Sequence, residues 1–372
     1  TKEARENALQ NTESCTFIIT SYALLKRDSD EYENLKFSYC FIDEAQYIKN
    51  AKTKNAQAVK KINAERYFAL TGTPIENSLS ELWSIFDFVM PGYLSTHKDF
   101  AARYEKETPA LDDLRNKVRP FILRRMKKDV LSELPEKIEN TVYSDFEDEQ
   151  RDIYAAFLNE ARKEIDGIFK SGENAVRILS LLTRLRQICC HPRLINPNYK
   201  KESGKLSLLK ELVISAVSSG HRILIFSQFT SMLGIINDCL SQKGISCFYL
   251  DGSTPSSERI QMANRFNGGE RQVFLISLKA GGTGLNLIGA DTVIHYDPWW
   301  NPAVTDQASD RAYRIGQTRA VQVIKLVTKN SIEEKILKLS EKKRGLADNI
   351  IRENKSLLSS LSKDELLSLF GM

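Results

Sequence analysis

The sequence predicts an α/β protein with two parallel-sheet lobes and a helical segment between them. Short apolar runs recur in both halves of the 372 residues, and helix-compatible stretches separate them, as in parallel strands joined by crossover helices. Polar clusters directly follow several of these runs, and the carboxyl ends of strands are where such sheets bind ligands. Between the halves, from residue 79 to about 194, apolar residues recur with the helical period.

Composition limits the class of protein. The chain has 53 basic and 48 acidic residues, interspersed, and a net charge of +5, which fits a nucleic-acid partner without requiring one. No apolar run is long enough to cross a bilayer, so no membrane partner is expected. The six cysteines include no Cys-x-x-Cys pair, and Cys189-Cys190-His191 is a poor tetrahedral set. We therefore expect reduced cysteines in an intracellular protein, without a metal at this triplet.

Three strands are expected in the first lobe, over residues 17–21, 37–42 and 67–70, with a helix over 53–63. The second strand stops at Asp43-Glu44-Ala45-Gln46, and the third stops at Thr71-Gly72-Thr73-Pro74. An aspartate after a strand can hold the Mg²⁺ that bridges nucleotide phosphates, and the next glutamate can orient or deprotonate the attacking water. A bare Asp-Glu pair is more often a helix N-cap with an acid in the first turn. The second tetrad favours the catalytic interpretation.

Five strands are expected in the second lobe, over residues 222–227, 247–250, 273–277, 292–296 and 321–327. Polar clusters again stand at strand ends, and their small residues let backbone N–H groups approach a phosphate oxygen of a nucleotide or of DNA. Tight turns explain each glycine equally well when it is taken singly. The clusters are Ser227-Gln228-Phe229, residues 251–254 and residues 277–286.

Two arginines, Arg311 and Arg314, stand three residues apart in a segment that is predicted to be helical, residues 310–317. That spacing puts both guanidinium groups on one helix face, where they suit the charge that develops on a transferred phosphoryl group. From this octapeptide alone, a basic surface helix that makes ordinary ion pairs is an equal alternative.

Helices are also expected over residues 81–88, 149–169 and 173–189, and over 332–337 and 361–370 near the end. Residues 119–128 contain five basic residues within ten, with apolar residues interleaved. They form either a solvated amphipathic helix or a segment that contacts DNA or responds to nucleotide.

The ordered set of motifs resembles that of the Swi/Snf-type DNA translocases, double-stranded-DNA-dependent ATPases of the second superfamily of helicase-like motors. The resemblance covers nearly the whole chain from about Thr16. It implies two RecA-like lobes, the first incomplete, with helical insertions between them. It also implies ATP and Mg²⁺ as cofactors, double-stranded DNA as a partner gripped through its phosphates, and protein–DNA complexes as substrate. The motifs are the two tetrads, the continuation Ile75-Glu76-Asn77-Ser78, and Asp310-Arg311-Ala312-Tyr313-Arg314-Ile315-Gly316-Gln317.

The resemblance also implies residue roles. Trp300 is equally well explained by core packing, and Tyr313 stands where many members have histidine. The implied catalytic residues are Glu44, Arg311 and Arg314; the implied nucleotide-site residues are Asp43, which would hold Mg²⁺, with Gln307, Gly282 and Gly284; the implied DNA contacts are Thr71, Thr73, Gly252, Ser253, Arg259, Lys279, Asn286 and Trp300.

Such a motor needs a Gly-x-x-x-x-Gly-Lys-Ser/Thr loop around the nucleotide phosphates. The only Gly-Lys dipeptide is Gly204-Lys205, and it has Tyr199 and Leu206 where the loop needs glycine and a hydroxyl. We therefore expect the carboxyl-side portion of a motor. Its predicted domains are a first-lobe part over 1–97, helical protrusions and linker over 98–203, and a second lobe over 204–372.

Two other functions stay open: a non-catalytic DNA-binding or partner-binding fragment, and a strand-separating helicase of the same superfamily. The isolated chain is expected to be inactive without the phosphate loop. A monomer is expected, in a bacterial cytoplasm because the region between the lobes is compact, or in the nucleus if the source is eukaryotic.

Overall fold

The structure is a computed structural model. It divides into two compact units, which are described separately: unit 1 comprises Thr1–Arg124 and Ala347–Ser360, and unit 2 comprises Arg125–Leu346 and Leu361–Met372. The predicted domain boundaries at 97/98 and 203/204 stay predictions. The described residues are 3, 5, 7, 9, 15–72, 79–104, 110–125, 127, 131, 133–171, 175–281, 284–347 and 363–371.

Unit 1 contains a two-stranded parallel sheet, β1 (Lys36–Ile42) and β2 (Asn63–Ala69), joined by helix α4 (Lys54–Lys60). The Thr53 hydroxyl caps α4 by accepting the Ala56 N–H, as N-cap threonines do. These elements confirm two predicted strands and the helix between them, although β2 begins four residues before the predicted position.

The predicted strand over 17–21 is wrong. Residues 17–20 are irregular, and Ser21 instead caps helix α2 (Tyr22–Arg27) by accepting the Leu24 N–H. Phe17 and Ile19 are 84% and 96% exposed. A short apolar, β-branched run is typical of a strand, but among the described residues this segment pairs with no strand.

Helices pack around the small sheet and beside it. One cluster joins Ile42 of β1 and Val59 of α4 to Phe88 of α5, and a second packs α5 against α6 and α7. The remaining elements of unit 1 are α3 (Ser29–Glu33), the 3-10 turn η2 (Ala45–Ile48), α5 (Leu79–Val89), α6 (His97–Tyr104), α7 (Ala110–Val118) and η3 (Arg119–Phe121).

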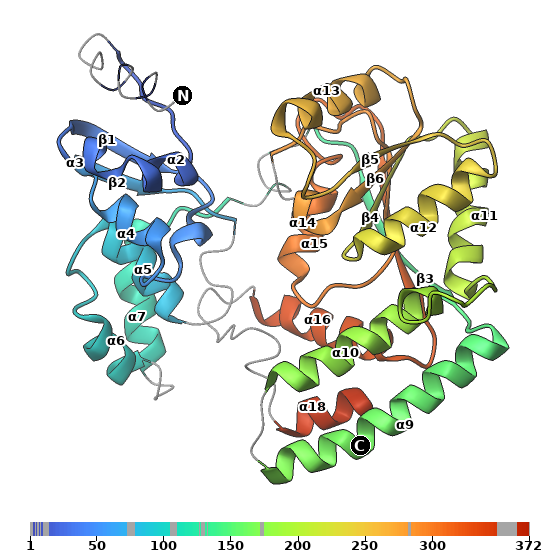
Figure 1. The fold of residues 1–372 in the computed structure, drawn as a ribbon. Helices are drawn as coiled ribbons and strands as arrows, with labels where there is room; N and C mark the ends of the chain where they lie inside the picture. The colour runs from blue at the N-terminus through green and yellow to red at the C-terminus, as the bar shows by residue number, and fades with distance from the viewer. Residues whose placement is uncertain are drawn as a thin grey trace. The chain divides into compact units, whose positions relative to one another are not determined.

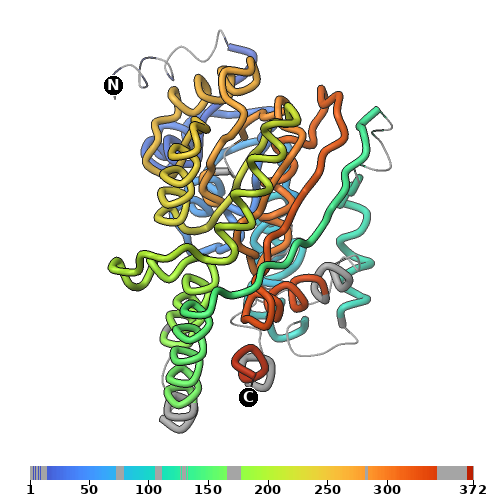
Figure 2. The backbone as a smooth tube through the Cα atoms, turned by 90° about the vertical axis from the view of Figure 1, so that its right-hand side faces the viewer, coloured from blue at the N-terminus to red at the C-terminus, as the bar shows by residue number. Residues whose placement is uncertain are grey.

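Unit 2 is built on a six-stranded parallel sheet with the order β3-β8-β7-β4-β6-β5. Five of its strands confirm the sequence prediction. The sixth, β3, lies in the segment predicted to be helical and pairs with β8 along one edge of the sheet (Figure 2). The strands are β3 (Lys137–Ser144), β4 (Ile223–Ser227), β5 (Cys247–Leu250), β6 (Val273–Ser277), β7 (Thr292–His295) and β8 (Val321–Thr328).

Helices cover both faces of this sheet (Figure 1). Helices α11 (Gly204–Ser218) and α12 (Thr230–Ser241) lie on one face. Helices α13 (Ser256–Asn267), α14 (Leu278–Gly281) and α15 (Pro302–Ser309) lie on the other. Every residue of β4 and β6 is buried, which explains why their sequences are continuous apolar runs.

Two long helices, α9 (Asp148–Ser171) and α10 (Ala175–Cys190), pack against each other in unit 2 and confirm the prediction for this part of the middle segment. The last elements are η4 (Pro192–Leu194), α16 (Ile332–Ala347) and α18 (Lys363–Phe370). Arg162 of α9 and Lys335 of α16 donate to the Phe370 and Leu369 carbonyls, and so cap the carboxyl end of α18. In the described part of the chain no helix combines the length and apolarity of a membrane span.

Candidate functional site

The carboxyl end of β1 is held in a strained turn. Glu44 has φ 50° and ψ 53°, a left-handed conformation that is uncommon for residues other than glycine and often marks functional sites. Its N–H donates to Asp43 Oδ1 at 2.8 Å. Only a four-residue 3-10 turn follows, and Glu44 makes no side-chain cap to it. The helix N-cap alternative is therefore not what this structure contains.

A hydrogen-bonded bridge joins the ends of the two strands. Gln46 Nε2 donates to Glu44 Oε2 at 2.6 Å, and Thr71 Oγ1 donates to Gln46 Oε1 at 2.9 Å. The structure thus brings together Glu44 and Thr71, two predicted site residues from separate motifs. Gln46 was part of the first tetrad but had no role of its own in the prediction. Thr73, the other predicted residue of the second tetrad, lies outside the described residues.

The Asp43 side chain is exposed, while its carbonyl accepts the Tyr22 hydroxyl at 2.8 Å. Burial, with the nearby Asp43 and Glu44 carboxylates, raises the pKa of Tyr22, so this hydroxyl stays protonated. The donor set fits Mg²⁺, which often takes one or two protein carboxylates and completes its shell with water and phosphate. Among the described residues no cluster of three or more His, Cys, Asp or Glu suited to a metal is found.

In unit 2, the loop after β5 is shaped by Arg259. Its guanidinium donates to the carbonyls of Thr254, Asp251 and Gly252 at 2.7, 3.3 and 3.2 Å. The Ser253 hydroxyl and N–H both donate to Asp251 Oδ1, which lowers the pKa of Asp251. Gly252 and Ser253 are exposed. Arg259 therefore organises the loop that carries two other predicted DNA contacts.

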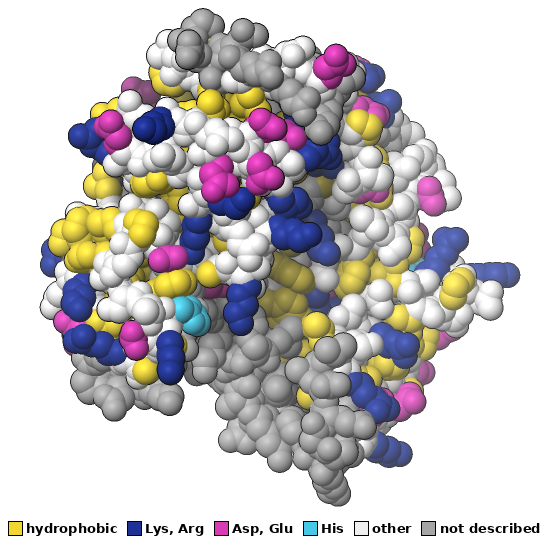
Figure 3. Space-filling view, turned by 60° about the vertical axis from the view of Figure 1, so that its left-hand side comes forward, with side chains coloured by type: hydrophobic (Ala, Val, Ile, Leu, Met, Phe, Trp, Pro, Cys, Tyr) yellow, Lys and Arg dark blue, Asp and Glu magenta, His cyan; other side chains and the backbone are white. Residues whose placement is uncertain are grey.

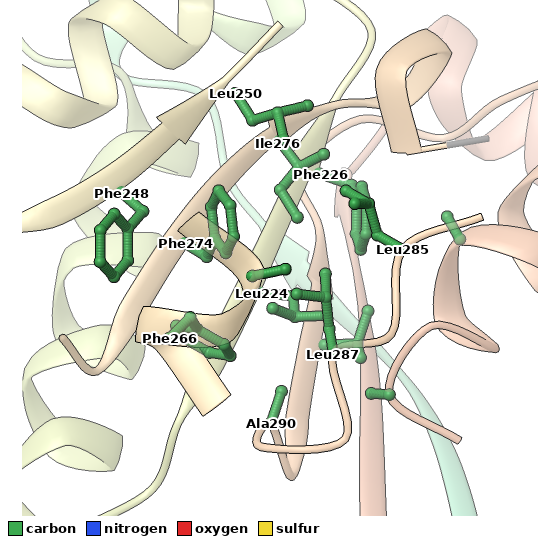
Figure 4. Packing of buried hydrophobic residues seen from close by; sticks show 14 of the residues in the cluster. Leu224, Phe226, Phe248, Leu250, Phe266, Phe274, Ile276, Leu285, Leu287 and Ala290 are labelled. Atoms are coloured by element: carbon green, nitrogen blue, oxygen red, sulfur yellow. The ribbon is translucent and has the colours of Figure 1, made fainter. Parts of the chain in front are cut away.

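The segment after β6 leaves two predicted DNA contacts, Lys279 and Asn286, exposed. Leu285 and Leu287 anchor it, because both side chains point into the core beside Phe226 and Leu224 of β4 (Figure 4). Gly284 has a positive φ of 29°. Gly282 lies outside the described residues.

The prediction of a helix over 310–317 is wrong. Helix α15 ends at Ser309, and residues 310–316 form successive turns. Arg311 is only 8% exposed, whereas Arg314 is exposed, so the two guanidinium groups do not share a helix face. Gln307, on α15, is half-buried.

Long-range hydrogen bonds explain this turn. The Leu287 N–H donates to the Arg311 carbonyl at 3.0 Å. The buried Gln317 amide donates to the carbonyls of Ala290 at 2.7 Å and Ala312 at 3.0 Å. Gly316 adopts φ 98°, which glycine accommodates most easily.

A histidine supports the start of the turn. His295 Nε2 lies 2.8 Å from Ser309 Oγ, and the ring stacks on Phe226. Burial lowers the pKa of His295 to about 3, so the imidazole is neutral at physiological pH.

The family comparisons agree with these motifs. The model of the SNF2-related domain matches residues 2–194, and that of the helicase conserved C-terminal domain matches residues 204–316. The chain belongs to the SNF2-related family.

Curated relatives of this SNF2-related chain include the putative ATP-dependent helicase/translocase YwqA of Bacillus subtilis, at 40% identity over 97% of the chain. An uncharacterized ATP-dependent helicase of Mycoplasma genitalium is 38% identical over 95% of the chain. The chain spans 40% and 34% of the lengths of these two proteins.

Among solved structures, the Sulfolobus solfataricus SWI2/SNF2 ATPase core in complex with double-stranded DNA is similar at 36% identity and a TM-score of 0.55. The match covers 94% of this chain and 76% of that one. It confirms the predicted α/β class with parallel sheets.

Two predictions about this SNF2-related chain can be examined in unit 2. Lys205 is fully buried and paired with Glu333, and a Cβ on Gly204 would lie 2.0 Å from the Asp145 carbonyl oxygen. This Gly-Lys dipeptide is therefore the buried first turn of a helix.

Trp300 is 6% exposed, with its ring against the Arg186 guanidinium, which favours core packing over a DNA contact.

Proposed function

We propose that the chain is the carboxyl-side portion of an ATP-dependent motor that moves along double-stranded DNA and remodels protein–DNA complexes without necessarily separating strands. The observation that carries this is the Glu44–Gln46–Thr71 bridge, which joins the two motifs at the ends of adjacent strands. The names of the relatives and the DNA complex of the similar ATPase core support it.

In this proposal Asp43 holds Mg²⁺, and Glu44 orients the attacking water or accepts its proton. Bound ATP supplies the phosphoryl group. Arg311 and Arg314 stabilise the negative charge that develops on that group, and Gln307, Gly282 and Gly284 bind the nucleotide. The left-handed backbone of Glu44 fixes the direction of its side chain, and Gln46 Nε2 donates a hydrogen bond to one of its carboxylate oxygens.

The motor binds DNA mainly through its phosphates, so its affinity for DNA falls steeply with added salt and depends little on base sequence. The exposed Gly252, Ser253, Lys279 and Asn286 support this proposal for unit 2. Basic and acidic side chains are interspersed over the visible surface (Figure 3).

The incomplete first lobe is also a proposal. It is supported by the two-stranded sheet, one face of which presents Tyr39, Phe41 and Phe68 at 53%, 63% and 43% exposure, with Leu70 directly after β2 at 51%. The Phe41 and Phe68 rings stack with centroids 4.8 Å apart. Contiguous exposed aromatic side chains usually mark a surface that another segment or chain covers.

The deciding experiment measures ATP hydrolysis by this chain with and without double-stranded DNA, beside the Glu44→Gln variant. We expect salt-sensitive duplex binding without turnover, because the chain lacks the Gly-x-x-x-x-Gly-Lys-Ser/Thr motif. DNA-stimulated turnover that depends on Glu44 would show that other residues of this chain, or another subunit, bind the nucleotide phosphates. Binding that varies with base sequence as much as with salt would contradict the motor.

The absence of that motif also favours a second candidate function for the isolated chain, a non-catalytic DNA-binding fragment. A strand-displacement assay on the full-length parent separates the third candidate, a helicase. Monomeric state and location, in a bacterial cytoplasm or a nucleus, stay predictions.

A further inference from the structure

Arg186, on α10, is a fully buried guanidinium that contacts two loops. Its side chain is 1% exposed. Nη1 donates to Gln228 Oε1 at 2.7 Å, and Nη2 donates to the Pro298 carbonyl at 2.8 Å and to Asp297 Oδ2 at 3.2 Å. The rings of Phe229, Trp299 and Trp300 surround it, with centroids 5.0–5.4 Å from the guanidinium carbon.

These two loops follow neighbouring strands. Gln228 follows β4 and leads into α12, while Asp297 lies just beyond β7. The Asp297 carboxylate also accepts the Ser227 hydroxyl and the Gln228 N–H. Arg186 and Asp297 thus fasten both loops to α10 at the carboxyl edge of the sheet.

The geometry at Gln228 is directional. Because Arg186 can only donate hydrogen bonds, it holds the amide by its oxygen, and Nε2 is directed away from the guanidinium. A planar guanidinium fork can fix three acceptors at once, which lysine cannot do. Pure stability does not require this arrangement, since an apolar replacement for a buried ion pair is often neutral or stabilising.

We propose that Arg186 is a positioning residue for DNA binding: it holds the loop at Gln228 and the first turn of α12 in the arrangement that contacts the phosphate backbone. This inference rests on the proposed function. It assigns Arg186 no direct contact with DNA.

Unit 2 supplies a matched control. Lys205 and Glu333 form a second ion pair, with both side chains 0% exposed. This pair joins α11 to α16, and the Glu333 carboxylate also accepts a hydrogen bond from the Thr328 N–H. It is as buried as the Arg186–Asp297 pair, but the Gln228 loop is not among its contacts.

The test compares Arg186→Lys, the double variant Arg186→Met/Asp297→Asn and the control Lys205→Met/Glu333→Gln with the unsubstituted chain. Affinity for a fluorescent DNA duplex is measured over a range of salt, at a temperature where all are folded. Amide hydrogen exchange is followed over residues 228–232 and 297–303. The double variants remove both charges of a pair, which avoids leaving one charge buried alone.

We expect both Arg186 variants to bind DNA roughly tenfold more weakly at every salt concentration. The salt slope should not change, because residues 228–232 and 297–303 contain no lysine or arginine whose phosphate contact could be lost. Exchange should become faster in those two loops only. The control should keep the slope, the affinity and the exchange of residues 228–232, whatever its melting temperature. It does not control for residues 297–303, because the Lys205 ammonium lies 5.5 Å from the ring centroid of Tyr296, next to Asp297.

Folded Arg186 variants with unchanged affinity or unchanged loop exchange would overturn the inference. If the unsubstituted chain shows no salt-dependent duplex binding, the proposed function fails, and Arg186 positions nothing for DNA. If that chain binds while the Arg186 variants bind equally well, the inference alone fails.

Discussion

The two parallel sheets of this protein differ in how they are covered. In unit 2 every side chain of β4 and β6 is buried between helices, whereas β1 and β2 present three large aromatic side chains to solvent on one face. Helices on both faces are what a parallel sheet normally requires. In the described part of the chain, the unit 2 sheet is therefore covered on both faces, while one face of the unit 1 sheet is exposed.

The largest effect expected from this difference concerns two phenylalanines. Phe274 is 0% exposed in the unit 2 core (Figure 4), so Phe274→Ala should cost about 3–5 kcal/mol of unfolding free energy. Phe68→Ala, on the open face of β2, should cost only about 1 kcal/mol, most of it from the lost stack on Phe41. Urea unfolding of both variants measures this. A cost above about 2 kcal/mol for Phe68→Ala would mean that something covers the face.

The next largest difference is expected in the acid sensitivity of the two units, because both histidines with a lowered pKa lie in unit 2. Burial lowers the pKa of His295 to about 3 and that of His191 to about 4, from an ordinary 6.5. The unfolded chain therefore binds protons that the folded chain does not, and stability falls as pH drops below 6.5.

For His295 this loss continues down to about pH 3, with a slope of up to about 1.4 kcal/mol per pH unit for one group. His295→Gln should flatten the pH dependence of unit 2 unfolding, measured by denaturant titration between these limits. If the variant keeps the full slope, the pH dependence of stability comes from other groups. One such group is Glu139, whose pKa is lowered by Lys325 and Lys137.

The strands that sequence predicted correctly are those whose own residues carry the signal. β4 and β6 are continuous apolar runs because both faces are buried. β3 escaped prediction because it is an edge strand with Lys137 and Glu139 in its sequence. Residues 17–21 were assigned wrongly for the opposite reason, since a short apolar, β-branched run does not reveal whether a neighbouring strand exists.

The candidate site divides in the same way. The prediction that polar clusters follow adjacent strands holds for β1 and β2, where Glu44 and Thr71 are joined through Gln46. The turn at Arg311 depends on Gln317 reaching Ala290, a contact no local pattern contains. For Arg186, the sequence shows only a charged residue among apolar neighbours in a predicted helix, and it does not reveal the contacts with Gln228 and Asp297.

The smallest effect concerns the strand ends themselves. In unit 1 the strand-end side chains bond to one another, whereas Gly252 in unit 2 is exposed and a Cβ there would meet nothing within 4 Å. Gly252→Ala should therefore leave stability within about 0.5 kcal/mol, while the added methyl group obstructs close approach of a phosphate to the backbone.

We expect a severalfold loss of duplex affinity for Gly252→Ala at fixed salt, measured by fluorescence anisotropy. Gly234→Ala is the matched control, because Gly234 lies within α12 and a Cβ there also meets nothing within 4 Å. It should raise stability by about 0.5–1 kcal/mol and leave affinity unchanged. Equal affinity in both variants would remove Gly252 from the DNA contact and leave the exposed Lys279 and Asn286 as the residues to test next.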